Sequence, residues 1–65
     1  MKVRYFEDTD TLYIEIRDGA VAETRDVYEN TLLDVDHQGR MVAINIEYAK
    51  ERAELANVVY ERVEA

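Results

Sequence analysis

Residues 32–47 read LLDVDHQGRMVAINIE, and this stretch decides the fold. Apolar residues alternate with others on both sides of the polar segment 36–40, at Leu33, Val35, Val42, Ile44 and Ile46. Alternation of this kind is typical of a β-strand with one buried face. Gly39 suits a type I turn followed by a left-handed residue, because glycine takes that conformation without a Cβ clash. The stretch therefore predicts a β-hairpin.

A second hairpin is predicted nearer the N-terminus, around the acidic turn at residues 7–11. Apolar residues again alternate along its two strands, at Val3, Tyr5, Leu12, Ile14 and Ile16. Pairing Tyr5 with Leu12 and Val3 with Ile14 keeps these side chains on one face. A shift by one residue would place Arg4 on the core side, so we expect the first register.

The segment between the two hairpins is less regular. Asp18-Gly19 is a frequent hairpin dipeptide, and it predicts a turn after the second strand. Residues 23–28 mix valine with charged residues, which indicates an edge strand or a weakly buried one. Residues 29–31 then turn the chain into the 32–47 hairpin. Short connections favour an antiparallel meander, because parallel neighbours need long crossovers.

The periodicity changes after Glu47. Residues 49–56 are almost all strong helix formers, and the alanines at 49, 53 and 56 form a face suited to lying on a sheet. Lys50 and Glu54 are spaced to form an ion pair, and Asn57 can close the helix in the left-handed conformation. Residues 58–63 are rich in strand formers and favour a final strand, although Tyr60 and Val63 would also extend the helical stripe.

These patterns predict an α+β fold. It consists of a small antiparallel β-meander of five to six short strands, with one C-terminal helix packed on the sheet. With 65 residues the chain is one domain, residues 1–65, and such a chain buries only about 60% of its surface on folding. It contains no cysteine, so disulfides cannot add stability. A second copy of the chain is the expected source of further buried surface, which predicts a homodimer.

Charge and hydropathy exclude several classes of function. The formal net charge is −7 and the isoelectric point is near 4.5, which disfavours binding to nucleic acid. This charge either keeps a small protein soluble, which is the interpretation we favour, or attracts a basic protein partner. The basic residues are scattered and form no stripe for RNA. No apolar run approaches the roughly 18 residues of a membrane helix, and the N-terminus lacks a signal-peptide core. We therefore expect a cytoplasmic protein that does not bind a membrane.

Few residues suggest catalysis. The sequence has no serine and no cysteine, which removes the common hydroxyl and thiol nucleophiles. His37 is the one histidine, and its place in a turn is typical of a solvated residue. We expect no enzyme activity, no catalytic residue and no cofactor.

Two acidic motifs resemble cation sites. Residues 34–39 match the start of a calcium loop, but the twelfth position is Asn45 instead of a bidentate glutamate, and Val35 fits a buried strand. Glu7, Asp8 and Asp10 could hold a hard cation, yet such side chains also stabilise turns. We therefore predict no metal site.

Two aromatic residues have outward parity on neighbouring strands of the first hairpin. Phe6 and Tyr13 lie on the face opposite to the alternating apolar residues. They form either an interaction patch or a decoration of the exposed face, and the sequence favours neither interpretation.

Two segments together resemble a known family. Residues 5–14, YFEDTDTLYI, and residues 34–46, DVDHQGRMVAINI, resemble the two motifs of the small prokaryotic proteins called domain of unknown function 2283. Ala43 stands where these proteins usually have glycine, Asn45 where they have glutamate, and Lys50 where serine is common. The resemblance implies a small antiparallel sheet with a helix and no established activity. It transfers no site residues.

The resemblance also suggests a partner, because some relatives resemble the partner of a small basic toxin of the messenger-RNA interferase type. We therefore expect a small, self-associating binding or assembly protein that is not a catalyst. The alternative is an antitoxin-like acidic protein that neutralises a small basic RNase-type toxin.

Overall fold

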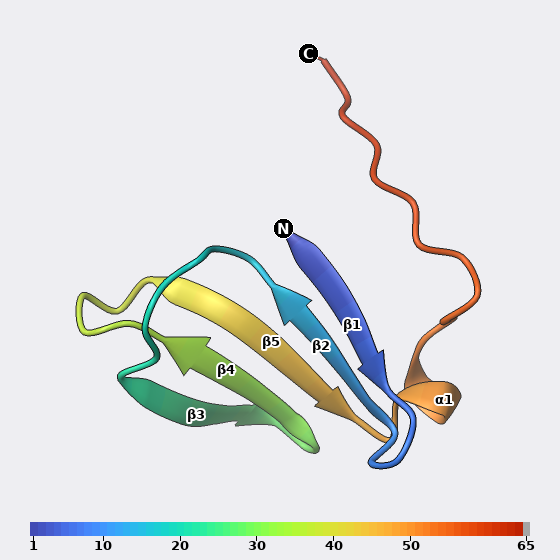
Figure 1. Cartoon of the computed structure of the whole chain (residues 1–65), viewed down its shortest axis with the longest axis horizontal. Coiled ribbons are helices and arrows are strands. Elements are labelled where there is room, and N and C mark those ends of the chain that lie inside the picture. Colours follow the sequence, from blue (N-terminus) through green and yellow to red (C-terminus); the bar gives the residue numbers. More distant parts are fainter. Residues whose placement is uncertain (65) are drawn as a thin grey trace.

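The computed structural model describes residues 1–64 and contains one antiparallel sheet of five strands with one short helix (Figure 1). Residue 65 of the predicted single domain lies outside the described part. The elements are β1 (Lys2–Phe6), β2 (Thr11–Glu15), β3 (Glu23–Tyr28), β4 (Thr31–Val35), β5 (Met41–Glu47) and α1 (Ala49–Arg52). The predicted α+β class, with an antiparallel sheet followed by a helix, is confirmed.

The predicted hairpin β1–β2 forms in the expected register. Tyr5 pairs with Leu12 and Val3 pairs with Ile14. The turn at residues 7–10 ends with Asp10 in the left-handed region, at φ 53°. The residue alternation excluded a shift by one residue, because that shift would have placed Arg4 on the core side of the hairpin.

The hairpin β4–β5 is also confirmed. Gly39 adopts φ 80°, as the predicted turn requires, and its N–H donates to the Asp36 carbonyl oxygen at 3.0 Å. The Asp36 N–H donates to the Arg40 carbonyl oxygen at 3.0 Å, which closes the turn. The register shifts between Asp34 and Val35, so a bulge lies next to the turn.

The strand order is β1-β2-β5-β4-β3, with β5 in the centre of the sheet. Strands β3, β4 and β5 form a meander, and the hairpin β1–β2 joins it along β5. The predicted hairpin turn at Asp18-Gly19 is therefore wrong, because β2 and β3 are not neighbours. β5 is apolar on one face and has a neighbour along each edge, and the apolar alternation of β2 matches that of β5. The charged β3 is stable only at the edge of the sheet.

Residues 16–22 make the connection from β2 to β3. The Ile16 N–H donates to the Val42 carbonyl oxygen at 2.7 Å, and the Ala22 N–H donates to the Val35 carbonyl oxygen at 2.8 Å. Figure 1 shows this segment passing across the ends of β5 and β4. It covers Val35 and Val42, each of which is only 2% exposed. The largest fully buried side chains therefore lie at this end of the sheet, whereas Leu12 and Ala49 are buried near the end that carries α1.

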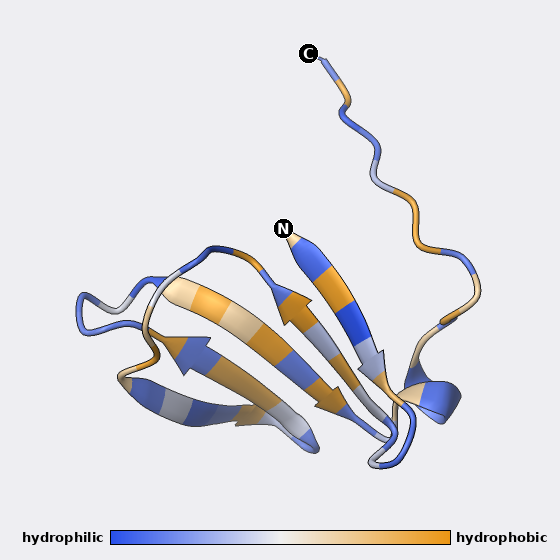
Figure 2. Cartoon of the chain, viewed as in Figure 1, coloured by the Kyte–Doolittle hydropathy of each residue, from blue (hydrophilic) through white to orange (hydrophobic). Residues whose placement is uncertain are grey.

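The pairing places apolar side chains on one face of the sheet. One row across the sheet consists of Val3, Ile14, Ile44 and Leu33, and the next row contains Leu12 and Ile46. We call these six residues the apolar face. Figure 2 shows the alternation of hydrophobic and hydrophilic residues that produces it.

The helix α1 is shorter than the predicted helix over residues 49–56. It ends at Arg52, and Ala53 is already extended at φ −142°. The Arg52 guanidinium donates to the Asn30 carbonyl oxygen at 2.6 Å and to the Glu47 carbonyl oxygen at 2.9 Å, which holds the turn against the end of the sheet. Only Ala49 of this turn is buried, and helical propensity alone does not sustain a short helix, so the strong helix formers beyond Arg52 do not prolong it.

The C-terminal segment also differs from both predicted alternatives. Residues 58–63 form neither a strand nor a helix, and Figure 1 shows them extending away from the sheet. Asn57 is not among the described residues with positive φ, and its side chain donates to Glu54 Oε1 at 3.3 Å. The predicted closure of the helix by Asn57 is therefore wrong.

Candidate interaction surface

The apolar face is only partly covered by the rest of the chain. Leu12 is buried, but Ile14, Leu33, Ile44 and Ile46 are only half-buried, even though β2, β5 and β4 are inner strands. Val3 on the edge strand is 40% exposed. The helix α1 lies at the end of the sheet, beside the turn at residues 7–10, and does not cover this face (Figure 1). The sheet therefore presents one incompletely covered hydrophobic surface.

The overall dimensions agree with an open arrangement. The accessible surface is 5367 Å², whereas a compact monomer of this mass exposes about 4,300 Å². The radius of gyration is 12.7 Å, compared with about 11 Å for a compact domain of this length. The chain thus exposes roughly 1,000 Å² more than its mass requires.

Part of this surface belongs to the C-terminal segment, residues 57–64. Its large apolar side chains are 66–82% exposed: Val58, Val59, Tyr60 and Val63. Within residues 1–64, no backbone hydrogen bond joins this segment to the sheet. Four exposed apolar side chains in eight residues are unusual for a terminal segment of a monomer.

The opposite face of the sheet carries the two aromatic residues that the sequence indicated. The rings of Phe6 and Tyr13 are 6.5 Å apart at an interplanar angle of 71°, which is an edge-to-face contact. Tyr13 is half-buried and Phe6 is 44% exposed. The rings therefore support each other, and their role in binding stays a prediction.

A polar cluster lies farther along this second face. The buried Asp34 accepts hydrogen bonds from Thr24 Oγ1 at 2.7 Å and from Asn45 Nδ2 at 3.1 Å. These three side chains join β3, β4 and β5. Sequence reasoning missed this cluster, because Thr24 and Asn45 become neighbours of Asp34 only through the strand order. Its donors satisfy the carboxylate, so its role is to hold the three strands in register.

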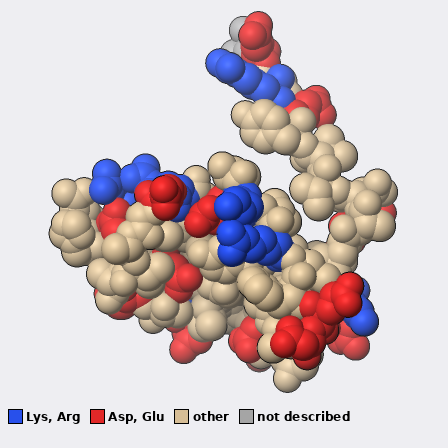
Figure 3. All heavy atoms as spheres, viewed as in Figure 1, with Lys and Arg blue, Asp and Glu red and all other residues tan. Residues whose placement is uncertain are grey.

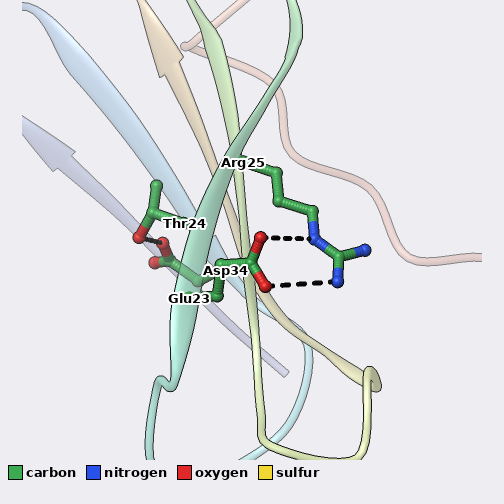
Figure 4. A network of polar contacts seen from close by, with 4 residues as sticks. All are labelled: Glu23, Thr24, Arg25 and Asp34. Carbon is green, nitrogen blue, oxygen red and sulfur yellow. Dashed lines mark hydrogen bonds and ion pairs between the residues drawn. The ribbon is translucent and has the colours of Figure 1, made fainter.

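Glu23 and Arg25 flank Thr24 on β3 and point to the other side of the strand (Figure 4). Their ion pair is 3.0 Å long and exposed to solvent. The hydrogen bond from Arg25 lowers the pKa of Glu23 and raises that of Arg25. An exposed pair of this kind keeps an edge strand charged and contributes little to stability.

The calcium-like motif divides between two unrelated structural roles. Asp34 belongs to the polar cluster, whereas Asp36 caps the β4–β5 turn. Asp36 Oδ1 accepts the backbone N–H groups of Gln38 and Arg40, both at 2.9 Å, and Oδ2 accepts Arg40 Nε at 2.9 Å. The backbone hydrogen bond from Arg40 is the largest cause of a lowered pKa for Asp36. His37 is exposed in the same turn.

The acidic turn at residues 7–10 is held by local hydrogen bonds. Asp10 Oδ1 accepts the Tyr5 hydroxyl at 2.6 Å and the Lys50 backbone N–H at 3.1 Å, so this carboxylate links the first hairpin to α1. The bond to Asp10 is the main cause that raises the pKa of Tyr5 to about 12. Asp8 Oδ1 accepts the Thr9 N–H at 3.0 Å.

Within residues 1–64, no three potential ligands from His, Asp or Glu gather as they would around a metal ion. The described part of the chain also has no detectable pocket.

Negative charge gathers at the end of the sheet that carries α1. The acidic residues of the turns and strand ends there are Glu7, Asp8, Asp10, Glu29, Glu47 and Glu51. Lys50 and Arg52 are the basic residues of α1, and Arg52 is engaged with backbone carbonyls. Figure 3 shows acidic atoms gathered at this end and basic atoms mainly elsewhere. This end accounts for most of the formal charge of −7.

Comparisons with known proteins place the chain in a family. None of the helices in the described residues is long and apolar enough to cross a membrane. No curated protein and no solved structure matches the chain. The family model described as "Protein of unknown function (DUF2283)" matches residues 2–50, which include all five strands. The chain therefore belongs to the DUF2283 family of proteins of unknown function.

Proposed function

We propose that this chain is a non-catalytic assembly module of the cytoplasm that associates with a second copy of itself through the apolar face. The observation that carries the proposal is the half-buried state of Ile14, Leu33 and Ile44 in the middle of the sheet. A two-layer structure is the usual way to bury such a face, and one chain supplies a single layer. A second copy supplies the other.

The size of the uncovered surface supports a dimer. Stable protein interfaces bury about 800 Å² on each partner, and the roughly 1,000 Å² that this chain exposes in excess of a compact monomer includes both the apolar face and the C-terminal segment. A chain of 65 residues without disulfides also gains more from a partner than a larger domain does.

The test measures molar mass by light scattering over a dilution series. We expect about twice the chain mass of 7.6 kDa. Two adjacent residues of β2 provide matched variants, because Ile14 lies on the apolar face and Tyr13 on the opposite one. Ile14→Lys should produce a monomer, and Tyr13→Lys should leave the dimer intact.

Circular dichroism establishes that each variant is folded. If Ile14→Lys unfolds, Val3→Lys replaces it, because Val3 is already 40% exposed and lies on the same face. If the dimer survives in Ile14→Lys and is lost in Tyr13→Lys, the interface belongs to the face of the aromatic pair instead. A wild-type chain that is monomeric at every concentration would refute self-association.

A second candidate function follows from the acidic end of the sheet. An antitoxin-like protein that masks a small basic RNase-type toxin would use such a charged surface to attract its partner. A neighbouring open reading frame for a small basic protein would provide the partner for the test. We expect Glu47→Lys combined with Glu51→Lys to weaken binding and to release RNA cleavage. Glu15→Lys, at the other end of β2, serves as the control.

A further inference from the structure

The geometry points to residues 57–64 as a strand that one protomer adds to the β1 edge of the second copy. This inference deepens the self-association proposed above and names the surfaces that two chains exchange. The segment and the edge are complementary in hydrogen bonding, in apolar side chains and in charge.

The outer edge of β1 is free in the described part of the chain. β1 is the first strand in the sheet order and pairs only with β2. Among residues 1–64, no backbone hydrogen bond from another segment reaches residues 2–6. β1 contains no proline and no bulge, and its charged residues Lys2 and Arg4 both lie on the face opposite to the apolar face.

The other edge is protected. β3 carries a register shift between Asp26 and Tyr28, and the ion pair of Glu23 with Arg25 lies along the strand. A bulge and charged side chains turn an edge away from pairing. A strand added to this sheet therefore has β1 as its site.

The C-terminal segment has the composition of a missing strand. Valine and tyrosine at residues 58, 59, 60 and 63 are strong strand formers, and their side chains are 66–82% exposed. The segment is free of backbone hydrogen bonds to the rest of the described chain, and it extends beyond the body of the molecule (Figure 1). An extended peptide that adds to a sheet edge gains its affinity from main-chain hydrogen bonds.

Charge selects the register. Arg4 on β1 and Glu61 in the segment are both exposed, and neither forms an ion pair within residues 1–64. An antiparallel pairing of Glu61 with Arg4 also sets Tyr60 opposite Tyr5 and Val59 opposite Phe6. Opposite charges and aromatic pairs across two strands both stabilise an antiparallel sheet. This register overlaps the whole of β1.

The second copy is the occupant because pairing of the segment with β1 of its own chain would leave the apolar face without a partner. In a two-fold exchange, each segment extends the partner's sheet along β1, with Tyr60 beside Tyr5 on the side of the apolar face. Val59 and Val63 then lie on the other side of the added strand, with Phe6 and Lys2. The exchange tethers two chains whose apolar faces both lack a cover.

The first experiment compares the full chain with a chain that ends at Asn57. We expect the dissociation constant of the dimer to rise about 100-fold or more on truncation, because the main-chain hydrogen bonds to β1 and the side-chain contacts across the two strands are both lost. If the truncated chain dimerises as tightly as the full chain, this inference is overturned, while the proposed self-association stands. A full chain that is monomeric throughout the dilution series overturns both.

Charge reversal tests the register without truncation. Arg4→Glu and Glu61→Arg should each raise the dissociation constant about tenfold, and the double variant should restore it to within about threefold of the wild type. Glu64→Arg is the control, because it changes the charge of the segment by the same amount without facing Arg4. Equal effects of Glu61→Arg and Glu64→Arg, with no restoration in the double variant, would refute the register.

Cysteine pairs distinguish exchange from closure within one chain, since the natural sequence has no cysteine. In the proposed register Val3 lies opposite Arg62. Separate Val3→Cys and Arg62→Cys proteins, mixed and oxidised, should give a covalent heterodimer that mass spectrometry identifies. A disulfide that forms only inside one chain carrying both substitutions, with no heterodimer from the mixture, would show closure on its own β1 and overturn exchange.

Discussion

Val42→Ala is the substitution that most directly tests where the stability of this small sheet resides. Val42 is 2% exposed on the central strand β5. The connection at residues 16–22 lies against it: the N–H groups of Ile16 and Arg17 both donate to its carbonyl oxygen, at 2.7 and 3.2 Å. The substitution keeps these backbone bonds and removes only the two outer methyl groups.

The expected loss is large for a domain of this size. Removing two buried methyl groups costs about 1.6 kcal/mol of transfer free energy, and the remaining cavity raises the total to about 2 to 3 kcal/mol. A domain of this length has a free energy of unfolding of roughly 3 to 10 kcal/mol. The control is Val27→Ala, because Val27 is 53% exposed on the edge strand β3 and should cost less than about 0.5 kcal/mol.

Urea unfolding, followed by circular dichroism, measures both values. The protein concentration must be the same in every experiment, because a dimer gains apparent stability with concentration. The slope of free energy against urea should stay unchanged if only the stability differs. Equal losses for Val42→Ala and Val27→Ala would show that burial beneath the 16–22 connection does not stabilise the fold, and would refute the assignment of the core to this end of the sheet.

Three further substitutions test local features. Gly39→Ala should lower the free energy of unfolding by about 1 kcal/mol, because φ is 80° there. Gly19→Ala should raise the free energy of unfolding by about 0.5 kcal/mol, because the added Cβ would meet Val42 at an ordinary 3.9 Å. Urea unfolding measures both changes. Tyr5 should ionise with a pKa of about 12 instead of 10.0 in an absorbance titration, and Asp10→Asn should bring this pKa back towards 10. The contribution of the Tyr5 hydroxyl to stability should be present below pH 10 and lost as the pH rises through 12. Because the pKa of Asp36 is lowered in the folded state, its carboxylate contributes to stability above pH 3.8, and this contribution is lost as the pH falls through the pKa of the folded state. Asp36→Asn should therefore weaken the dependence of the urea midpoint on acid pH.

The two hairpins could be predicted from the sequence because their information is local. In each, alternation on both sides of a polar turn determines which side chains share a face, and together with the short turn it leads to the register of Val3 with Ile14. Gly39 identifies its own turn through a conformation that other residues avoid. Strand 23–28 was also predicted at an edge, because its charges are compatible with no other place.

The order of the strands could not be predicted in the same way. Strands β2 and β5 carry similar alternating patterns, and nothing in either pattern states that they are neighbours. Asp18-Gly19 indicated a hairpin by its local turn chemistry, but the pairing of Ile14 with Ile44 buries more apolar surface than any pairing with the charged β3 could. The cluster of Thr24, Asp34 and Asn45 was missed for the same reason, since it exists only once the strand order is known.

The C-terminal segment also shows that a local sequence pattern does not determine structure without a neighbour. A strand cannot exist alone, because its N–H and C=O groups need a neighbour, so the propensity of residues 58–63 becomes structure only where an edge is available. In a single chain the segment has found none, while β1 exposes a regular edge with Arg4 on it. The helix prediction failed for a related reason, since α1 buries only Ala49 and helical propensity alone does not sustain a short helix. An unpaired strand sequence, an unpaired edge and a half-covered apolar face in one short chain would all find a neighbour in the second copy proposed above.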